Sequence, residues 1–463
     1  MVRIQTSALL CASRPDIDSR MFRPQAIIRT GYTSLLLAFF LVGCSGGSGP
    51  LPEPEPHIPS LGDRLCMSGL HQPEALNDVI VDHLLALGIR RVRIDLRWHV
   101  VEPEKGVFHF DRLESEVRHY LDAGISVLGL LVYGNPWASS QTEYDTTYPP
   151  DDPTDYANYV AAVVEYFGTD IQEYEVWNEP NVGLRFWKPE IKGDPVAYGT
   201  LLIEAVQAGR SVCPECTFAF GGPFFHSLFV DGHIPYLTAA QEAHPDLSQY
   251  YDAMGFHPYA IYPPQAAPEG PPGDAEWAFT RMFDEVKDVM AIQGAQDKPI
   301  WTTEVGWPVF GDVDQERQAA YLVRAFLHLI WKDSPMVCWY NIIDGDNPDE
   351  FPPEDAFGLL SNDPDDPQPK TAYWALAQLG NRFAKYHLTD DLRPQLPEGV
   401  YGYALAGPEG DVWWAIWSHP EPVMVQLPVA VVEQRSMIGD LVPPSEEGPL
   451  EIGQNPVFFR LAP

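Results

Sequence analysis

Between residues 63 and 387 the chain alternates two kinds of hydrophobic pattern. Short apolar runs rich in β-branched residues predict buried parallel strands, and longer segments with apolar positions at helical spacing predict helices that cover those strands. Gly88, Gly124 and Gly168 follow three of the helical segments and mark their ends. We expect strands at 64–70, 91–98, 126–133, 174–178, 217–221, 253–257, 299–304 and 336–342, and helices at 74–87, 113–123, 156–167, 197–211, 277–292, 315–331 and 371–386.

Repeated strand–helix units over this length predict an α/β fold with a closed (β/α)8 TIM barrel at residues 63–387. An open doubly wound sheet is the alternative, but it would want a glycine-rich phosphate loop after the first strand, and residues 65–75 offer none. From residue 388 onward helical periodicity disappears. Short strands broken by Gly and Pro then predict a small C-terminal β-sandwich, with expected strands at 400–406, 412–417, 423–427 and 457–461.

The tryptophans of the C-terminal segment have two interpretations. Trp413, Trp414 and Trp417 lie in the sequence WWAIW and could bind carbohydrate. The segment is too apolar to be exposed as a whole, so we favour packing against the barrel.

The first 62 residues are interpreted as an export signal followed by a tether. Arginines precede a short apolar run that leads into Leu-Val-Gly-Cys44, which resembles a bacterial lipobox with Cys44 lipidated. An ordinary signal peptide cut nearby is the alternative, and Met21 is a candidate true start. Residues 45–62 form a Gly/Ser and then Pro/Glu tether, and no other apolar run is long enough to span a bilayer. Together with Ser45, these features indicate an exported lipoprotein, anchored at the outer membrane and facing the periplasm or the cell surface.

The net charge of the chain limits the kinds of molecule that it can bind. The chain carries a net charge of −36, and because residues 1–43 contribute +3, the remainder carries −39. This charge argues against nucleic acid and against anionic lipid as binding surfaces, so a lipid anchor would be the membrane contact. Aromatic residues make up 12% of the chain, and their flat faces suit sugar rings. We expect a monomer.

Four cysteines remain after the leader. Cys213 and Cys216 have the spacing of a redox or zinc pair, but no second pair completes a metal site, so a local disulfide is favoured over free thiols. Cys66 and Cys338 fall in the first and last expected barrel strands. These strands are neighbours in a closed barrel, so we expect the two sulfurs to lie close together.

Two glutamates are the candidate catalytic residues. Glu179 and Glu304 each end an apolar run and are followed by a strand breaker, so each carboxylate is expected where a strand opens into a loop. Two acids at the same ends of parallel strands are the arrangement that cleavage of a glycosidic bond needs. Asn178 and Glu179 are consecutive, so both can reach one site only if the strand breaks there.

The motifs around these glutamates resemble a known family. WNEPN at 177–181 with Phe186-Trp187 resembles the acid/base motif of glycoside hydrolase family 39, a family of the clan of (β/α)8 retaining glycosidases. TEVGW at 303–307 resembles the nucleophile strand of bacterial members that cut exopolysaccharides. The likeness spans residues 63–385. The residues after Glu304 differ from those of the xylosidases and iduronidases of family 39, which argues against those two activities.

The resemblance implies roles for particular residues. Glu179 would be the acid/base and Glu304 the nucleophile, separated by ~5–5.5 Å in a retaining enzyme rather than the ~6.5–9.5 Å of an inverting one. Asn178 would hold the sugar 2-hydroxyl, and Arg93 and Tyr259 would keep Glu304 ionised. His257 fits the sixth strand of the clan and is either a ligand of the substrate or a structural residue.

Aromatic residues at strand ends complete the expected site. By the resemblance, Trp339 would be the floor beneath the cleaved sugar and would precede a cis peptide bond to Tyr340. Other candidates for sugar contact, each weighed against simple packing, lie in the strand-end loops: Tyr133, Asn135, Trp137, Trp187 and Trp307.

These observations predict a retaining glycoside hydrolase, endo-acting on a cell-surface or extracellular polysaccharide, with no cofactor and no metal. A transglycosylase with the same residues and a non-catalytic glycan-binding lipoprotein are the alternatives. The presence of both acids argues against the last.

Overall fold

The computed structural model describes residues 59–70, 74–141, 145–190, 192–224, 233–259, 266–271, 278–345, 353–363, 366–443 and 448–463. Cys44, the leader and most of the tether lie outside these residues, so the expectations for them stay predictions. Residues from His57 to Pro463 form one compact unit. Within the described residues, no helix is both long and apolar enough to cross a membrane.

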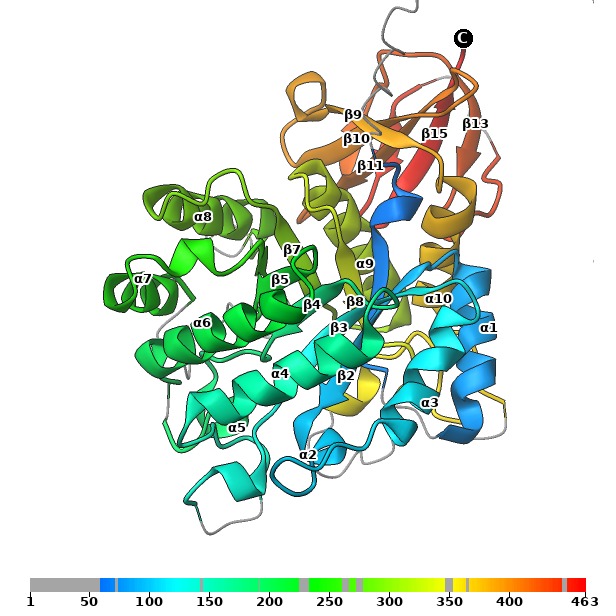
Figure 1. Ribbon diagram of the computed structural model, residues 1–463. Helices are drawn as coiled ribbons and strands as arrows, with labels where there is room; N and C mark the ends of the chain where they lie inside the picture. The colour runs from blue at the N-terminus through cyan, green and yellow to red at the C-terminus, as the bar shows by residue number, and fades with distance from the viewer. Residues whose placement is uncertain are drawn as a thin grey trace, which may run out of the picture. The chain divides into compact units, whose positions relative to one another are not determined.

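Eight parallel strands close into a barrel in the order β1 to β8, with β8 paired to β1 (Figure 1). This closure confirms the expected TIM barrel and excludes the open sheet. The strands are β1 Leu65–Ser68, β2 Arg91–Arg97, β3 Ser126–Val132, β4 Glu173–Val176, β5 Thr217–Phe220, β6 Ala253–Gly255, β7 Ile300–Val305 and β8 Val337–Tyr340.

Ten α-helices are described, and the long ones surround the barrel (Figure 1). Asp152, Asp194 and Asp314 cap α4, α6 and α9 by accepting hydrogen bonds from backbone N–H groups of the first turn, which fixes where each helix begins. The helices are α1 Asn77–Leu87, α2 Trp98–Val101, α3 Asp111–Leu121, α4 Pro153–Phe167, α5 Gly183–Phe186, α6 Pro195–Val212, α7 His233–Ala243, α8 Phe279–Ile292, α9 Gln315–Trp331 and α10 Thr371–Ala377.

Several helices differ from expectation. The short helices α2 and α5 were not predicted. The segment α7 was not predicted, because Pro235 stands in its first turn and its apolar residues do not form a regular stripe. The last barrel helix ends at Ala377 and continues as a π-helical turn, Gln378–Arg382. In that turn the carbonyl oxygen of Gly380 lies against Gly88, where a Cβ would come within 2.0 Å, so the two backbones approach as closely as only glycine allows.

The C-terminal segment forms two antiparallel sheets, as expected for a β-sandwich. The larger has the order β13-β15-β11-β10-β9, and the smaller pairs β12 with β14. Their bounds are β9 His387–Asp391, β10 Val400–Ala406, β11 Val412–Ser418, β12 Val423–Val425, β13 Val431–Arg435, β14 Leu450–Ile452 and β15 Val457–Leu461.

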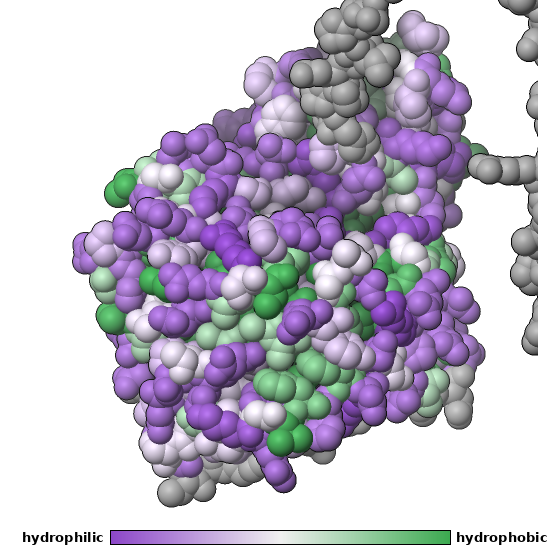
Figure 2. Space-filling model, in the orientation of Figure 1, coloured by the Kyte–Doolittle hydropathy of each residue, from purple (hydrophilic) through white to green (hydrophobic). Residues whose placement is uncertain are grey.

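The tryptophans of β11 are packing residues. Trp413 and Trp417 belong to the same hydrophobic core as the barrel, whereas Trp414 packs on the opposite face of the sheet. All three are buried, which confirms the preference for packing over carbohydrate binding. By contrast, polar and charged residues cover most of the outer face seen in Figure 2.

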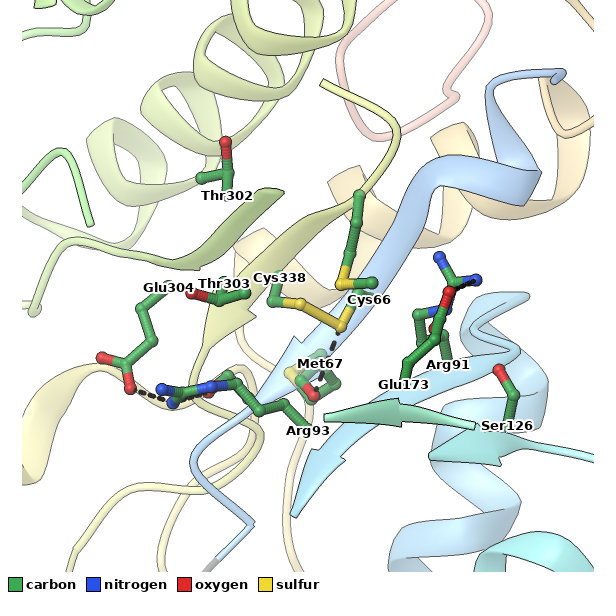
Figure 3. The surroundings of a disulfide bond; sticks show 12 residues. Cys66, Met67, Arg91, Arg93, Ser126, Glu173, Thr302, Thr303, Glu304 and Cys338 are labelled. Atoms are coloured by element: carbon green, nitrogen blue, oxygen red, sulfur yellow. Dashed lines mark hydrogen bonds and ion pairs between the residues drawn. A yellow bond between two sulfur atoms is a disulfide. The ribbon is translucent and has the colours of Figure 1, made fainter. Parts of the chain in front are cut away.

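Both expected disulfides are present. Cys66–Cys338 joins β1 to β8, and Cys213–Cys216 closes a short turn after α6. Cys66 and Cys338 are fully buried in a small core that also contains Leu128, Ala219 and Trp301. Figure 3 shows this disulfide between Arg93 and Glu304 on one side and Arg91 and Glu173 on the other.

Candidate active site

Glu179 reaches the site because its strand breaks early. The strand β4 ends at Val176, two residues before its expected end. Trp177 and Glu179 then adopt positive φ values of 68° and 45°, a conformation that non-glycine residues rarely take. The strand therefore breaks before Asn178 and Glu179, as their joint presence in one site required.

Glu304 is held by two donors. Arg93, on β2, donates from Nη1 to Glu304 Oε1 at 2.5 Å, and Tyr259 donates its hydroxyl to Glu304 Oε2 at 2.9 Å. These contacts are the ones expected for the two residues. Arg93 also donates from Nη2 to Asn178 Oδ1 at 2.9 Å, so the expected sugar ligand Asn178 is oriented by the same guanidinium.

His257 lies between the two glutamates. Its Nδ1 is 2.8 Å from Glu179 Oε1 and 4.0 Å from Glu304 Oε2, and its Nε2 is 3.0 Å from Thr303 Oγ1. The ring is completely buried. Burial lowers the pKa of His257 to about 4, so the imidazole is neutral over most of the pH range.

Glu179 has the environment of an acid. The residue is 5% exposed, and burial is the main reason that the pKa of its carboxyl rises to about 8. Arg185 and Arg93 oppose this rise, whereas Glu354 and Glu175 add to it. At neutral pH Glu179 therefore carries a proton, whereas Glu304 accepts hydrogen bonds from Arg93 and Tyr259.

One oxygen of Glu179, one oxygen of Glu304 and a ring nitrogen of His257 lie within 4.8 Å of one another. Three such atoms could hold a metal ion. The hydrogen bonds to Arg93, Tyr259 and Thr303 account for the cluster without one. The expectation of no metal stays a prediction.

Glu175 is a site residue that the sequence reasoning missed. It is fully buried and accepts hydrogen bonds from Arg93 Nε at 2.7 Å, from the Gly222 backbone N–H at 2.7 Å and from Thr303 Oγ1 at 3.2 Å. A signal was available, because a charged residue inside a buried strand needs a charged partner and Arg93 stands inside another strand.

Three expected sugar platforms are buried. Trp187, Trp307 and Trp339 are 2%, 1% and 0% exposed, so their indoles have almost no surface to offer a ligand. Trp307 Nε1 donates to the Ala266 carbonyl at 2.9 Å, and its ring stacks on Trp339 at 6.2 Å. Burial favours packing, the alternative weighed for Trp187 and Trp307, and contradicts the expectation that Trp339 forms the floor beneath the cleaved sugar.

The cis peptide bond expected before Tyr340 lies one residue later, between Tyr340 and Asn341; a second lies between Val132 and Tyr133. Tyr340 is half-buried, so it offers the surface that Trp339 lacks. Burial and then the charges of Glu354 and Glu304 raise the pKa of Tyr340, so its hydroxyl lies near the site, and sequence reasoning missed it.

Three expected sugar contacts at the end of β3 and just after it also differ in exposure. Asn135 is buried and donates from Nδ2 to the Glu102 carbonyl at 2.8 Å, so its amide is used within the fold and contradicts the expected sugar contact. Trp137 donates to the same carbonyl but stays half-buried. Tyr133 is also half-buried and stacks on Phe186 with ring centres 5.6 Å apart. Trp137 and Tyr133 remain candidates.

Comparison with known proteins bears on the fold. No protein-family model matches the chain, and no curated protein matches its sequence. Among solved structures, a family 39 glycoside hydrolase from Bacteroides cellulosilyticus WH2 is similar, with a TM-score of 0.70 and 24% identity over 88% of this chain and 82% of that one. A GH39 β-xylosidase from Caulobacter crescentus has a TM-score of 0.58 and 15% identity, covering 86% of this chain and 96% of that one.

A third similar structure is the endo-β1,6-glucanase BT3312, with a TM-score of 0.55 and 13% identity over 87% of this chain and 91% of that one. At these identities the likeness shows a shared fold: a (β/α)8 barrel followed by a C-terminal sheet.

Proposed function

We propose that this protein is a retaining glycoside hydrolase. The observation that carries the proposal is the pair of glutamate oxygens within 4.8 Å, with burial keeping the Glu179 carboxyl protonated and Arg93 and Tyr259 donating hydrogen bonds to Glu304. Carboxyl groups lie ~5–5.5 Å apart in retaining enzymes and ~6.5–9.5 Å apart in inverting ones, so two oxygens this close favour retention. All three similar structures are glycoside hydrolases by name, which supports the same class of reaction.

The reaction would take two steps. In the first, Glu304 attacks the anomeric carbon while Glu179 gives its proton to the glycosidic oxygen, so that the bond to the leaving sugar breaks and an ester to Glu304 forms. In the second, Glu179, now a carboxylate, takes a proton from water, and the water oxygen displaces Glu304 from the anomeric carbon. Arg93 and Tyr259 stabilise the Glu304 carboxylate before attack and again as it leaves.

We further propose that the substrate is a cell-surface or extracellular polysaccharide that is cut internally. The strongly acidic chain disfavours a heavily anionic glycan. The similar structures include a xylosidase and a β1,6-glucanase, so xylan and β1,6-glucan belong in the first panel, together with exopolysaccharides. Rapid loss of viscosity before release of small sugars would support internal cutting.

The test of the reaction is Glu304→Gln. This change removes the nucleophile and keeps its size, so turnover should disappear while oligosaccharide binding persists. Thr302→Val is a matched control, because Thr302 lies on β7, the strand of Glu304, but bonds to Ser334 rather than to the site. A Glu304→Gln variant that cleaves as well as the parent would refute the proposal.

The same site could serve two functions other than hydrolysis. A transglycosylase would pass the sugar from Glu304 to an acceptor, which product analysis with added acceptor would show. A non-catalytic glycan-binding lipoprotein would bind sugar without cleavage in both parent and variant.

We also propose that Cys44 is lipidated and anchors the protein at the outer membrane. The support is the sequence Leu-Val-Gly-Cys44 after a basic and apolar segment. Metabolic labelling with a radioactive fatty acid should mark the parent and not Cys44→Ser. Equal labelling of the two would refute the proposal.

A further inference from the structure

The chain after Glu179 turns back on itself. The Val182 N–H donates to the Glu179 carbonyl at 2.9 Å, and the Phe186 N–H donates to the Val182 carbonyl at 2.8 Å. This turn brings Arg185, in α5, close enough for its charge to act on the Glu179 carboxyl. The guanidinium lies 4.8 Å from the centre of the Phe186 ring, which itself stacks on Tyr133. Arg185 is therefore supported by a fixed aromatic pair.

Arg185 is joined to a residue from the opposite side of the barrel. Its Nη1 lies 2.8 Å from Glu354 Oε1. Arg185 follows β4, whereas Glu354 follows β8, and these two strands face each other across a closed barrel of eight. The ion pair thus crosses the mouth of the barrel. The side chains are 56% and 28% exposed, so both can still contact a ligand.

We infer that the Arg185–Glu354 ion pair is a binding subsite for the sugar that leaves, and that it selects an uncharged sugar. The inference rests on the proposed function. The glycosidic oxygen must meet the proton of Glu179, so the leaving sugar lies next to Glu179 and beneath or beside this pair. Burial raises the pKa of Glu179, and the opposite effects of Arg185 and Glu354 on that pKa support their closeness to the carboxyl.

The chemistry of the Arg185–Glu354 ion pair explains why an uncharged leaving sugar is preferred. A sugar hydroxyl both donates and accepts, and the pair offers guanidinium donors beside carboxylate acceptors. The formal charges of Arg185 and Glu354 cancel, so an uncharged sugar replaces water without losing an ionic contact. A uronate would have to compete with Glu354 for Arg185 while lying beside a like charge.

The experiment traps the glycosyl–enzyme with two acceptors of nearly equal size, methyl β-glucoside and methyl β-glucuronide. In the transfer step an acceptor hydroxyl oxygen bonds to the anomeric carbon, the ester bond to Glu304 breaks, and the hydroxyl proton passes to Glu179. The donor is the glycan that the panel shows to be cleaved. The quantity measured is the ratio of the two transfer products in parent, Glu354→Gln, Arg185→Met and a control, Arg281→Met. Arg281 forms a similar exposed ion pair with Glu285 on α8, at 3.0 Å.

The parent and Arg281→Met should both favour the glucoside. Glu354→Gln leaves the guanidinium without its carboxylate and should move the ratio about fivefold toward the glucuronide, the effect of one exposed ion pair. Arg185→Met should reduce transfer to both acceptors relative to hydrolysis. A ratio unchanged by Glu354→Gln, or a parent that favours the glucuronide, overturns the inference while leaving the proposed function intact. A parent that cleaves no glycan in the panel overturns both.

Discussion

His257 connects the acid Glu179 to Thr303, with Nδ1 2.8 Å from Glu179 Oε1 and Nε2 3.0 Å from Thr303 Oγ1. The Thr303 hydroxyl is also within 3.2 Å of Glu175 Oε1 and donates to that carboxylate. Since the hydroxyl proton is used there, Thr303 accepts from His257 Nε2–H. A neutral imidazole then has only a lone pair at Nδ1, which accepts the proton of Glu179. The chain of bonds therefore favours a protonated Glu179.

Thr303→Val tests this chain. Without the hydroxyl, His257 is free to carry its proton on Nδ1 and donate it to Glu179, which stabilises the carboxylate and lowers the pKa of Glu179. The upper limb of the pH–activity profile should shift to lower pH, and kcat/KM at neutral pH should fall, but by less than the about 10²–10⁴-fold expected when the general acid itself is removed.

Thr302→Val is the control for this change. Thr302 is equally buried, but its hydroxyl faces Ser334 Oγ at 3.2 Å, and Figure 3 shows the two threonine side chains pointing in different directions. We expect Thr302→Val to affect stability without moving the pH profile. A shift of the same size in both variants would show that the effect is structural.

The pH dependence of the parent follows from Glu179. Burial raises the pKa of its carboxyl to about 8, and the general acid must be protonated, so kcat/KM should fall as the pH rises through about 8. Glu179→Gln should abolish that limb and lower activity by about 10²–10⁴-fold on glycans with poor leaving groups. Aryl glycosides that need no proton should lose less. If kcat/KM of Glu179→Gln still fell at high pH as in the parent, that fall would have to come from the titration of another group.

The strands β4 and β8 show which features of the fold depend on local residue preferences and which do not. The barrel could be predicted because alternating strand and helix periodicities are a property of many residues together. A break near Asn178 and Glu179 was required if both were to reach one site, but its position at Val176 could not be predicted, since positive φ at Trp177 and Glu179 depends on tertiary contacts and not on the residues' own preferences. Trp339 was misjudged for the same reason, because the residue types of a strand do not say which of Trp339 and Tyr340 faces the core.

Contacts between residues far apart in the sequence could be predicted only where the fold alone determines which strands are neighbours. Cys66 and Cys338 could be paired because a closed barrel makes its first and last strands neighbours. Glu354 could not be connected with Arg185, because that contact depends on the paths of two loops from opposite strands.

A buried ion network links the barrel to the C-terminal sheet. Glu269 Oε1 accepts from Trp417 Nε1 at 2.7 Å and lies 2.9 Å from His328 Nε2, while both Glu269 oxygens bind the fully buried Arg324. Glu269→Gln leaves the charge of Arg324 buried and uncompensated, which should lower the free energy of unfolding by about 3–5 kcal/mol in urea titrations. Glu285→Gln, at an exposed pair, should cost less than about 1 kcal/mol.

The same network predicts a pH dependence of stability. Although burial opposes its charge, Arg324 and His328 hold the pKa of Glu269 well below its ordinary value of 4.5. The folded state therefore binds fewer protons there than the unfolded state, so this stabilisation is present above pH 4.5 and is lost as the pH falls further. Glu269→Gln should reduce that loss. If the stability of parent and variant fell equally with falling pH, a group other than Glu269 would cause the loss.

The two disulfides should contribute unequally to stability. Cys66–Cys338 closes a loop over a sequence separation of 272 residues, whereas Cys213–Cys216 spans a separation of 3. If the disulfides act by limiting the unfolded chain, loop entropy gives about 6 kcal/mol for the long loop and about 2 kcal/mol for the short one. The double variant Cys66→Ala/Cys338→Ala should therefore unfold at much lower urea concentration than Cys213→Ala/Cys216→Ala. Equal losses would mean that local packing, and not loop closure, determines their effect.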